Sequence, residues 1–270
     1  MLQSLPLAFL LLCLAFIDPV QAEMSHEKMQ ASEFDRASAL ARSQSAIGNP
    51  LPDLQFQDTR GDFVNLSEYQ GKPLLISLIY TSCFHICPTT TTHLSTIVEK
   101  AREALGQDSF NVVSIGFDTF RDSPPMMAQF ARKQKIDVQQ WKFLSTDKVT
   151  IDKLVEDLGF LYFPSPNGFD HLIQTSIIDK QGLLSAQVYG MNFETPLLIE
   201  PLKRLVFSSK DEGLVRQVTD KIRLFCTVYD PAADKYRFDY SIFIGTFIGV
   251  CSVLALGLQL LKEWRLTLGS

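Results

Sequence analysis

The sequence has no lysine- or arginine-rich block, and its formal net charge is -5 over 270 residues. The electrostatic attraction that draws proteins to nucleic-acid phosphates is therefore missing, which excludes nucleic acid as an expected partner. Internal repeats are also absent, and the longest low-complexity tract is the four threonines at 89–92. The remaining composition, 46% hydrophobic and 20% charged, is typical of one globular domain with appendages.

Long apolar runs occur at the two ends of the chain. Residues 4–17 form a run too short for a stable membrane anchor, and Val20, Gln21 and Ala22 supply the small residue, spacer, small residue pattern of a signal-peptidase site. No lysine or arginine precedes this run, so an uncleaved N-terminal anchor is the alternative. Residues 240–261 contain no charge over 22 positions and predict a transmembrane helix. Export by the signal peptide would place the body outside the cytoplasmic membrane, with a short tail inside.

Cysteine is scarce, with five residues in the whole chain. Cys13 belongs to the expected signal peptide, and Cys251 lies in the expected membrane helix, where it serves as a small apolar residue. Cys83, Cys87 and Cys226 remain. In an oxidising compartment structural disulfides come in pairs and free thiols are reactive, so these three thiols need a reason.

Between the apolar ends, strand patterns alternate with helix patterns. In chain order we expect a hairpin at 54–66, a buried strand at 73–80, a helix ending at Leu105, a strand at 110–118, a helix at 122–134, a strand at 141–145, a helix at 150–159, a hairpin at 171–190, and helices at 195–209 and 212–225. This order requires a mostly parallel central sheet that is covered on both faces, with antiparallel strands at one edge. It predicts an α/β thioredoxin-like fold with an N-terminal β-hairpin extension.

The segment "CFHICP" carries the chemistry. Cys87 is expected to begin a helix and Cys83 to lie one turn earlier, so both sulfurs should meet the positive end of the helix dipole and have lowered pKa values. Thiolates serve redox chemistry and metal binding equally. A third interpretation, two buried structural thiols, is weaker because the loop opens at the carboxyl edge of the sheet, where α/β folds place their sites.

A histidine adds a second part to this site. Redox motifs of the thioredoxin type prefer two residues between the cysteines, and a cis-proline loop faces them; here there are three, and His171 stands directly before the strand expected from about Leu172. Two thiolates and one imidazole form a soft three-coordinate site suited to Cu(I) and able to hold Cu(II), whereas zinc would usually require a fourth ligand. A lone histidine is nevertheless more often a packed or surface residue. The other histidines are weaker candidates: His85 should point away from the sulfurs, His93 should be partly exposed, and His26 lies in the lead-in.

Three separated blocks carry a family resemblance. "TSCFHICPTT", "VSIGFDTFRDSPPMMAQFA" and "GFDHLIQTSIIDKQG" resemble, in order and spacing, the signature blocks of the Sco/SenC family of copper-binding thioredoxin-fold proteins. The resemblance covers about residues 46–208 and implies copper ligation by Cys83, Cys87 and His171. It further implies a non-enzymatic metallochaperone that assembles the dinuclear copper site of cytochrome c oxidase subunit II, or a related copper-receiving protein, with periplasmic copper donors or thiol reductases as further partners.

Two alternatives use the same fold. A thiol-disulfide reductase would cycle Cys83 and Cys87 through a disulfide to keep the client's copper-ligand cysteines reduced. A thiol peroxidase is weaker, because nothing beside Cys83 supplies a peroxide-binding set.

Further residues of these blocks receive structural roles. Asp122 or Ser123 can cap the following helix, and Asp118, at the end of a strand near the cysteine loop, could support the metal ligands. The C-terminal anchor and Cys226 depart from the common family pattern and resemble some bacterial members. For Cys226 a buried thiol beside Phe225 is favoured over a transient copper or disulfide partner.

The expected organisation is a single-pass protein of the bacterial cytoplasmic membrane with its soluble domain on the periplasmic side. Its segments are a signal peptide (1–22), a lead-in (23–46), a thioredoxin-like copper-binding domain (47–210), a juxtamembrane helix and linker (211–238), a transmembrane helix (239–262) and a cytoplasmic tail (263–270).

Overall fold

The computed structural model describes residues 34–137, 140–207 and 214–268. The expected signal peptide, His26 and most of the lead-in lie outside these residues. The described end of the lead-in forms helix α1 (Arg36–Ser45), and the carboxylate of Asp35 accepts the first free backbone N–H groups of this helix.

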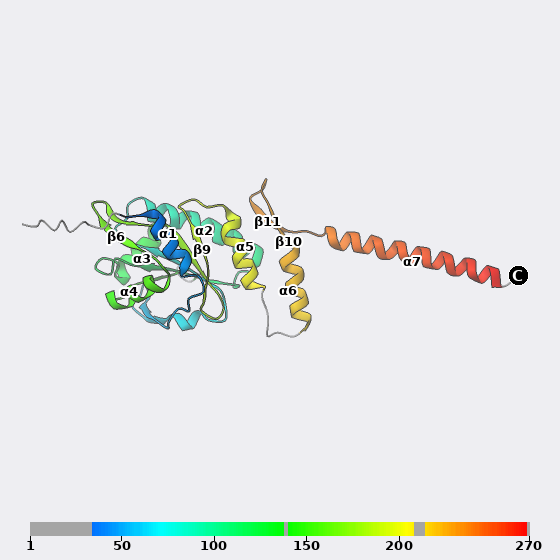
Figure 1. The fold of residues 1–270 in the computed structure, drawn as a ribbon, viewed down its shortest axis with the longest axis horizontal. Coiled ribbons are helices and arrows are strands. Elements are labelled where there is room, and N and C mark those ends of the chain that lie inside the picture. The colour runs from blue at the N-terminus through cyan, green and yellow to red at the C-terminus, as the bar shows by residue number, and fades with distance from the viewer. Residues whose placement is uncertain (1–33, 138–139, 208–213, 269–270) are drawn as a thin grey trace, which may run out of the picture. The chain divides into compact units, whose positions relative to one another are not determined.

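A five-stranded sheet in the order β5-β4-β3-β8-β9 forms the centre of the domain (Figure 1). Three strands of this sheet, β3 (Leu74–Ile79), β4 (Asn111–Gly116) and β5 (Lys142–Leu144), run parallel. Antiparallel β8 (Gln174–Ile178) and β9 (Leu184–Tyr189) complete one edge. Every residue of β3 is buried, as expected for a strand covered on both faces. The predicted mixed sheet with a late antiparallel hairpin is confirmed.

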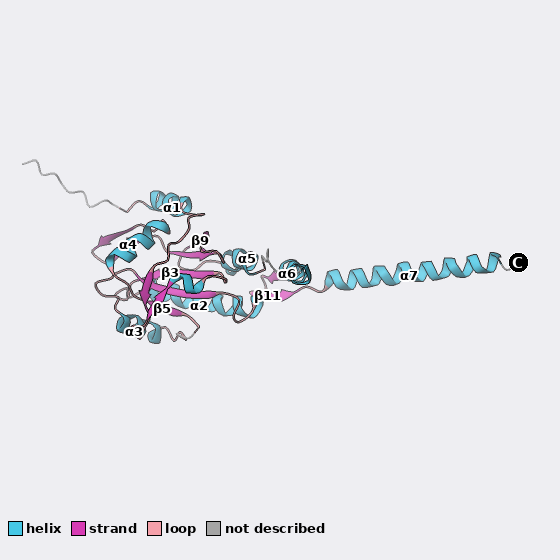
Figure 2. Ribbon diagram, turned by 90° about the horizontal axis from the view of Figure 1, so that it is seen from below, coloured by secondary structure: helices cyan, strands magenta, loops and turns pink. Residues whose placement is uncertain are grey.

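Helices cover both faces of this sheet (Figure 2). Right-handed connections place α2 (Ile86–Leu105) and α3 (Pro124–Lys133) on one face, while α4 (Lys148–Asp157) returns over the other. Helix α5 (Thr195–Val206) contacts α2 and β9. The apolar stripe predicted for α2 is buried in the core: Leu94, Ile97, Val98, Ala101 and Leu105.

The N-terminal hairpin extension is also confirmed. Strands β1 (Gln55–Gln57) and β2 (Phe63–Asn65) pair antiparallel and lead into the short 3₁₀ helix η1 (Leu66–Tyr69). Gln57 forms an isolated bridge to Ser145, directly after β5. The extension is therefore attached to the edge of the central sheet.

Two hairpins were not expected from the sequence. Strands β6 (Tyr162–Ser165) and β7 (Gly168–His171) form the first, so His171 ends a hairpin and β8 begins at Gln174 instead of Leu172. Strands β10 (Thr227–Asp230) and β11 (Lys235–Phe238) form the second, in the segment expected to be a linker. The linker prediction is wrong for these residues, because they are fixed by pairing.

The C-terminal part begins with α6 (Leu214–Cys226) and ends with α7 (Ser241–Leu268). Residues Ser241–Lys262 of α7 are long and apolar enough to cross a membrane. Within the described part of the chain this is the one helix that meets both conditions. It agrees with the transmembrane segment expected at 239–262.

Candidate metal centre

The cysteine pair lies in the loop between the carboxyl end of β3 and the first turn of α2. Cys83 is 9% exposed and Cys87 is 4% exposed, and both are free thiols. Helix α2 begins at Ile86. Pro88 fits in its first turn, because the N–H groups of a first turn have no partner within the helix and proline has no N–H. The backbone N–H of Cys87 donates to the Cys83 sulfur at 3.3 Å. The expected convergence of both sulfurs at the start of a helix is therefore present.

The two thiols are not equivalent. The Cys87 side chain is the main cause that lowers the pKa of Cys83 from 9.0 to about 4, with further hydrogen bonds from the backbone of Cys87 and His85 and from Tyr80, against the opposing effect of burial. The same Cys83–Cys87 hydrogen bond, together with burial, raises the pKa of Cys87. At neutral pH Cys83 is thus a thiolate that accepts a hydrogen bond from the Cys87 thiol. The sequence predicted lowered pKa values for both cysteines, which is wrong for Cys87.

His171 presents one free ring nitrogen. Its Nδ1 atom lies 2.7 Å from the carbonyl oxygen of Leu172, an acceptor, so Nδ1 carries the proton. Burial lowers the pKa of His171, which keeps the ring neutral. The remaining nitrogen, Nε2, then has an available lone pair, and this tautomer is the one that a metal-binding histidine needs.

An aromatic cluster connects the histidine with the cysteine loop. The Tyr80 ring lies 6.2 Å from the His171 ring between centroids, and the Tyr80 side chain hydrogen-bonds to Cys83. Phe117 and Phe160 pack on His171 with centroid distances of 5.5 and 5.3 Å. Burial, together with the neighbouring Cys83, raises the pKa of Tyr80, so its hydroxyl remains a proton donor. Tyr80 thus stands between the two parts of the site.

The described residues contain no group of three His, Cys, Asp or Glu side chains already arranged to hold a metal ion. The structure brings Cys83 and Cys87 together, and His171 contacts Tyr80, which hydrogen-bonds to Cys83. Three-coordinate binding therefore requires His171 and the sulfurs to approach each other. His171 lies at the end of the β6–β7 hairpin. Gly168 in this hairpin has φ +120° and approaches Tyr80 closely, since a Cβ on residue 168 would lie 2.8 Å from the Tyr80 hydroxyl.

Asp122 supports the cysteine loop. Its carboxylate accepts the backbone N–H and the hydroxyl of Thr81, each at 2.7 Å, and the backbone N–H of Asp118 at 2.9 Å. Burial raises the pKa of Asp122 to about 6. Of the two caps predicted for α3, Ser123 takes the N-cap position, whereas the Asp122 carboxylate binds the cysteine loop instead. Gly116 leaves room for this arrangement, since a Cβ there would meet the Asp122 Cβ at 2.4 Å.

The other candidate residues take different positions. Asp118 pairs with Arg121 at 3.1 Å, so its expected support of the metal ligands remains a prediction. His85 is exposed at the N-cap of α2, and His93 is half-buried with Nε2 2.8 Å from the Phe193 carbonyl oxygen. Cys226 is 5% exposed at the end of α6, in agreement with the favoured buried thiol.

Sequence reasoning missed Tyr80 and Phe117. A signal for both was present, because each residue directly follows a parallel strand, Tyr80 after β3 and Phe117 after β4. The carboxyl ends of neighbouring parallel strands meet at one sheet edge, so their side chains converge there. The rings lie 5.3 Å apart between centroids.

The substitution Tyr80→Phe is expected to raise the pKa of the Cys83 thiol by about 1 unit, because a hydrogen bond to a charged group contributes roughly 1.5 kcal/mol or more. The ultraviolet absorbance of the thiolate, followed during an acid titration of the metal-free protein, measures the pKa of Cys83. Tyr69→Phe, at a half-buried tyrosine on η1, is the matched control and should leave the titration unchanged. An unchanged midpoint in Tyr80→Phe would show that its hydroxyl does not act on Cys83.

Comparison with known proteins identifies the family. A model of the SCO1/SenC family matches residues 43–206. The SCO1 protein homolog of Bacillus subtilis (strain 168) is 28% identical over 90 residues, which are 33% of this chain and 46% of that protein. The chain thus matches less than half the length of this relative.

One solved structure shows the same fold, and a second is similar in sequence. A SCO1/SenC family lipoprotein from Bacillus anthracis str. Ames is 24% identical, with 58% of this chain and 95% of that chain covered and a TM-score of 0.54. ScoI of Bradyrhizobium japonicum, solved with copper bound, is 26% identical, with 59% and 99% covered and a TM-score of 0.47. Because the family match extends over more than half of the chain and includes both cysteines of the loop and His171, this chain belongs to the SCO1/SenC family.

Proposed function

We propose that the chain binds copper through the sulfurs of Cys83 and Cys87 and through Nε2 of His171. The observation that carries this proposal is the donor set: one preformed thiolate, one thiol in hydrogen-bond contact with it, and a neutral imidazole whose Nδ1 is already engaged. Two sulfurs and one imidazole suit Cu(I) and can also hold Cu(II). Membership of the SCO1/SenC family supports the same metal.

Copper would be cargo in this proposal. The Cys83 thiolate can accept the ion without a prior deprotonation, and ligation by Cys87 would release the proton that it donates to Cys83. The aromatic rings packed on His171 would limit the access of water to its imidazole. The cysteine loop lies at the end of the sheet with Phe84 and Ile86 exposed, so a recipient protein can reach it. Transfer would proceed by ligand exchange, without net chemistry on the protein.

The proposed recipient is the dinuclear copper site of cytochrome c oxidase subunit II or a related copper-receiving protein. The α7 segment would hold the domain at the membrane, on the periplasmic side, and raise its effective concentration near a membrane-embedded client. In this proposal residues 1–22 are a signal peptide, 23–46 a lead-in and 47–210 the copper-binding domain. Residues 239–262 are the transmembrane helix, and 263–270 form a cytoplasmic tail.

A thiol-disulfide reductase is the second candidate. The Cys83 thiolate could attack a client disulfide and release one client thiolate, after which Cys87, having lost its proton, would attack the mixed disulfide. The products would be a Cys83–Cys87 disulfide and a reduced client, and a separate thiol reductase would have to reduce the pair again. The asymmetric pKa values of the two cysteines favour this order of attack.

Substitution of His171 separates the two functions. In the full chain, solubilised in detergent, His171→Ala is expected to weaken Cu(I) binding by at least about 10-fold, since one of three proposed ligands is lost. Reduction of a client peptide disulfide should persist, because both cysteines remain. Competition with a chromophoric Cu(I) chelator gives the affinity. His93→Ala is the matched control, because His93 binds a carbonyl outside the site. Unchanged Cu(I) affinity together with intact reduction would favour the reductase.

A further inference from the structure

Within the described part of the chain, helix α6 carries an apolar face that stays exposed beside the first turns of α7, where Phe243 and Phe247 line the same apolar groove. Phe225 is 74% exposed and Ile222 is 38% exposed, and these residues lie three positions apart on the same side of the helix. Val228, in the first part of β10, is 45% exposed. Upstream in the sequence, Leu214 and Val218 continue the same helical spacing. An aromatic and an aliphatic side chain exposed together on an amphipathic helix indicate a contact surface.

A hydrogen bond places the end of α6 beside the start of the membrane-spanning segment. The backbone N–H of Asp239 donates to the carbonyl oxygen of Cys226 at 2.7 Å. The Asp239 carboxylate also accepts the backbone N–H of Ser241, the first residue of α7, at 2.9 Å. Phe225 is therefore adjacent, through Cys226, to the residue that begins the proposed membrane crossing.

The hairpin that connects the two helices is anchored on the domain. The ammonium group of Lys203 on α5 donates to the Thr227 carbonyl oxygen at 2.9 Å, and the Tyr236 hydroxyl donates to Glu200 at 2.9 Å. Asp234 accepts the Thr195 hydroxyl at 2.8 Å and also pairs with Lys100 of α2. The end of α6 is thus fixed both to the domain and to the start of α7.

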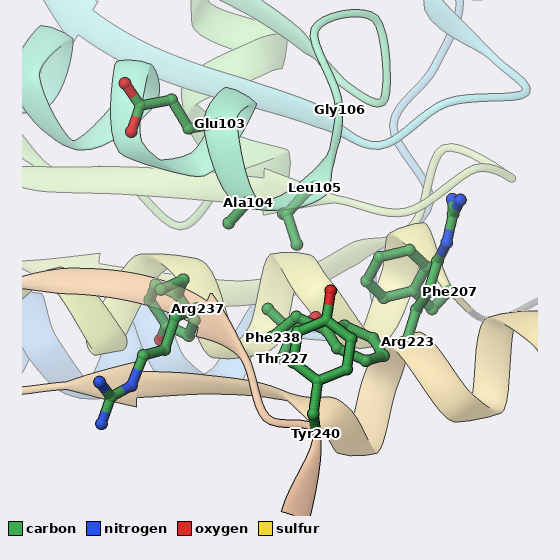
Figure 3. Close-up of a pocket in the computed structure, with 11 residues that line it drawn as sticks. Glu103, Ala104, Leu105, Gly106, Phe207, Arg223, Thr227, Arg237, Phe238 and Tyr240 are labelled. Atoms are coloured by element: carbon green, nitrogen blue, oxygen red, sulfur yellow. The ribbon is translucent and has the colours of Figure 1, made fainter. Parts of the chain in front are cut away.

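The opposite side of α6 faces the domain. A cavity of about 550 Å³ separates the end of α2 from α6 and the hairpin, and Arg223, Leu105 and Tyr240 are among its lining residues (Figure 3). The guanidinium groups of Arg223 and Arg237 point away from each other there, so the cavity does not form an anion site. Arg223 lines this cavity, whereas Ile222 and Phe225 line a separate, apolar groove beside the first turns of α7.

Charge complements this apolar face. Between Leu214 and Cys226 the sequence has Arg216, Lys221 and Arg223 against the single acid Asp220. A basic amphipathic helix with aliphatic and aromatic residues on one face is suited to the headgroup region of a bilayer with anionic lipids.

We propose that α6 lies in the surface of the membrane that α7 crosses, with Ile222 and Phe225 inserted at the boundary between headgroups and acyl chains. The occupant of the exposed face is the lipid surface. The inference rests on the membrane anchoring contained in the proposed function, and it adds that the domain is held in one orientation on the bilayer. The copper site would then face clients at a fixed angle and height.

Quenching by lipids brominated in the acyl chains tests this orientation. The full chain is placed in bilayers that contain anionic lipid, with Phe225→Trp combined with Trp264→Phe, so that the tryptophan introduced at position 225 reports on α6. A second variant, Ile222→Trp with Trp264→Phe, covers the case in which the first does not fold. Phe63→Trp with Trp264→Phe is the matched control, because Phe63 is 66% exposed on β2 of the extension. Trp141 is buried and contributes the same background fluorescence to each of the three variants.

We expect brominated lipid to remove most of the fluorescence added at positions 225 and 222 and none of that added at 63. The native chain supplies an independent reading, since Trp264 follows the membrane-spanning segment and should also be quenched. Quenching of Trp264 without quenching at 222 or 225 would overturn the surface position of α6 and leave the anchor intact. Loss of quenching at Trp264 as well would overturn the anchor itself.

Discussion

Replacement of Cys83 by serine is expected to remove both Cu(I) binding and the reactive thiolate. Loss of a residue that merely supports a metal ligand commonly weakens binding by about 10- to 100-fold, so loss of a proposed ligand that is also the preformed thiolate should exceed about 100-fold. Cys87 cannot substitute for it. Its thiol is 4% exposed, and burial, which raises the pKa of Cys87, still acts in the absence of Cys83. Chelator competition measures the affinity, and peptide mapping after iodoacetamide labelling at pH 7 measures the reactivity.

Cys87→Ser is the matched variant, and its expected behaviour differs. Copper affinity should fall for the same reason, but labelling at Cys83 should persist, because the backbone N–H groups of His85 and residue 87 still stabilise the thiolate. Equal loss of labelling in both variants would contradict the asymmetric pair. Mapping of the labelled peptide separates Cys83 from Cys226 and Cys251.

The pH dependence follows from the direction of the Cys83 shift. Its pKa is about 4 in the folded protein against an ordinary value of 9.0, so the labelling rate of the metal-free protein should remain nearly constant from pH 8 to pH 5 and fall as pH approaches 4. A folded-state pKa below the unfolded value also stabilises the fold. That contribution is fully present above the unfolded pKa near 9.0 and is lost as pH falls through about 4.

The sequence predicted those parts of the site that depend on local pattern. The apolar run before Cys83 gave β3, the helical spacing after Pro88 gave α2, and their junction placed the cysteine pair at the sheet edge. His171 could be named because it stands directly before the expected strand, where thioredoxin-like proteins place a cis-proline loop, and because the family resemblance pointed to it. The surroundings of His171 could not be predicted from the sequence, because β6 and β7 have four residues each and prolines lie among them, so these strands are too short for a periodic pattern.

Other features depend on contacts between distant residues. The unequal pKa values of Cys83 and Cys87 arise from the hydrogen bond between their side chains, from the backbone N–H groups that reach Cys83 and from burial, none of which the spacing encodes. Asp122 was read as a helix cap because the residue type and position fit, but Thr81, 41 positions earlier, competes for the same carboxylate. The β10–β11 hairpin was read as a linker because its stabilising partners, Lys203 among them, lie on α5.

Lys203→Met is expected to release the β10–β11 hairpin from the domain. Lys203 is 6% exposed, its ammonium group donates to the Thr227 carbonyl oxygen at 2.9 Å, and it pairs with Glu200 at 3.0 Å. It also lies 5.6 Å from the centre of the Tyr236 ring. Methionine retains most of the volume and removes the donor. A charge-assisted hydrogen bond of this kind contributes about 1.5–3 kcal/mol, so local opening of the hairpin should become roughly 10- to 100-fold more frequent.

Hydrogen exchange of the full chain measures this opening at the amides of residues 227–238. Lys148→Met is the matched control, because the Lys148–Asp152 pair is an exposed pair within one helix and should contribute little. Cu(I) affinity should stay unchanged in both variants, since Cys83, Cys87 and His171 lie in other elements. Unchanged exchange in Lys203→Met would mean that Asp234 and Tyr236 hold the hairpin alone. Faster exchange with unchanged affinity would instead show that anchoring of the domain and metal binding are separate properties of the chain, so that Lys203→Met could be used to ask whether copper delivery depends on a fixed orientation at the membrane.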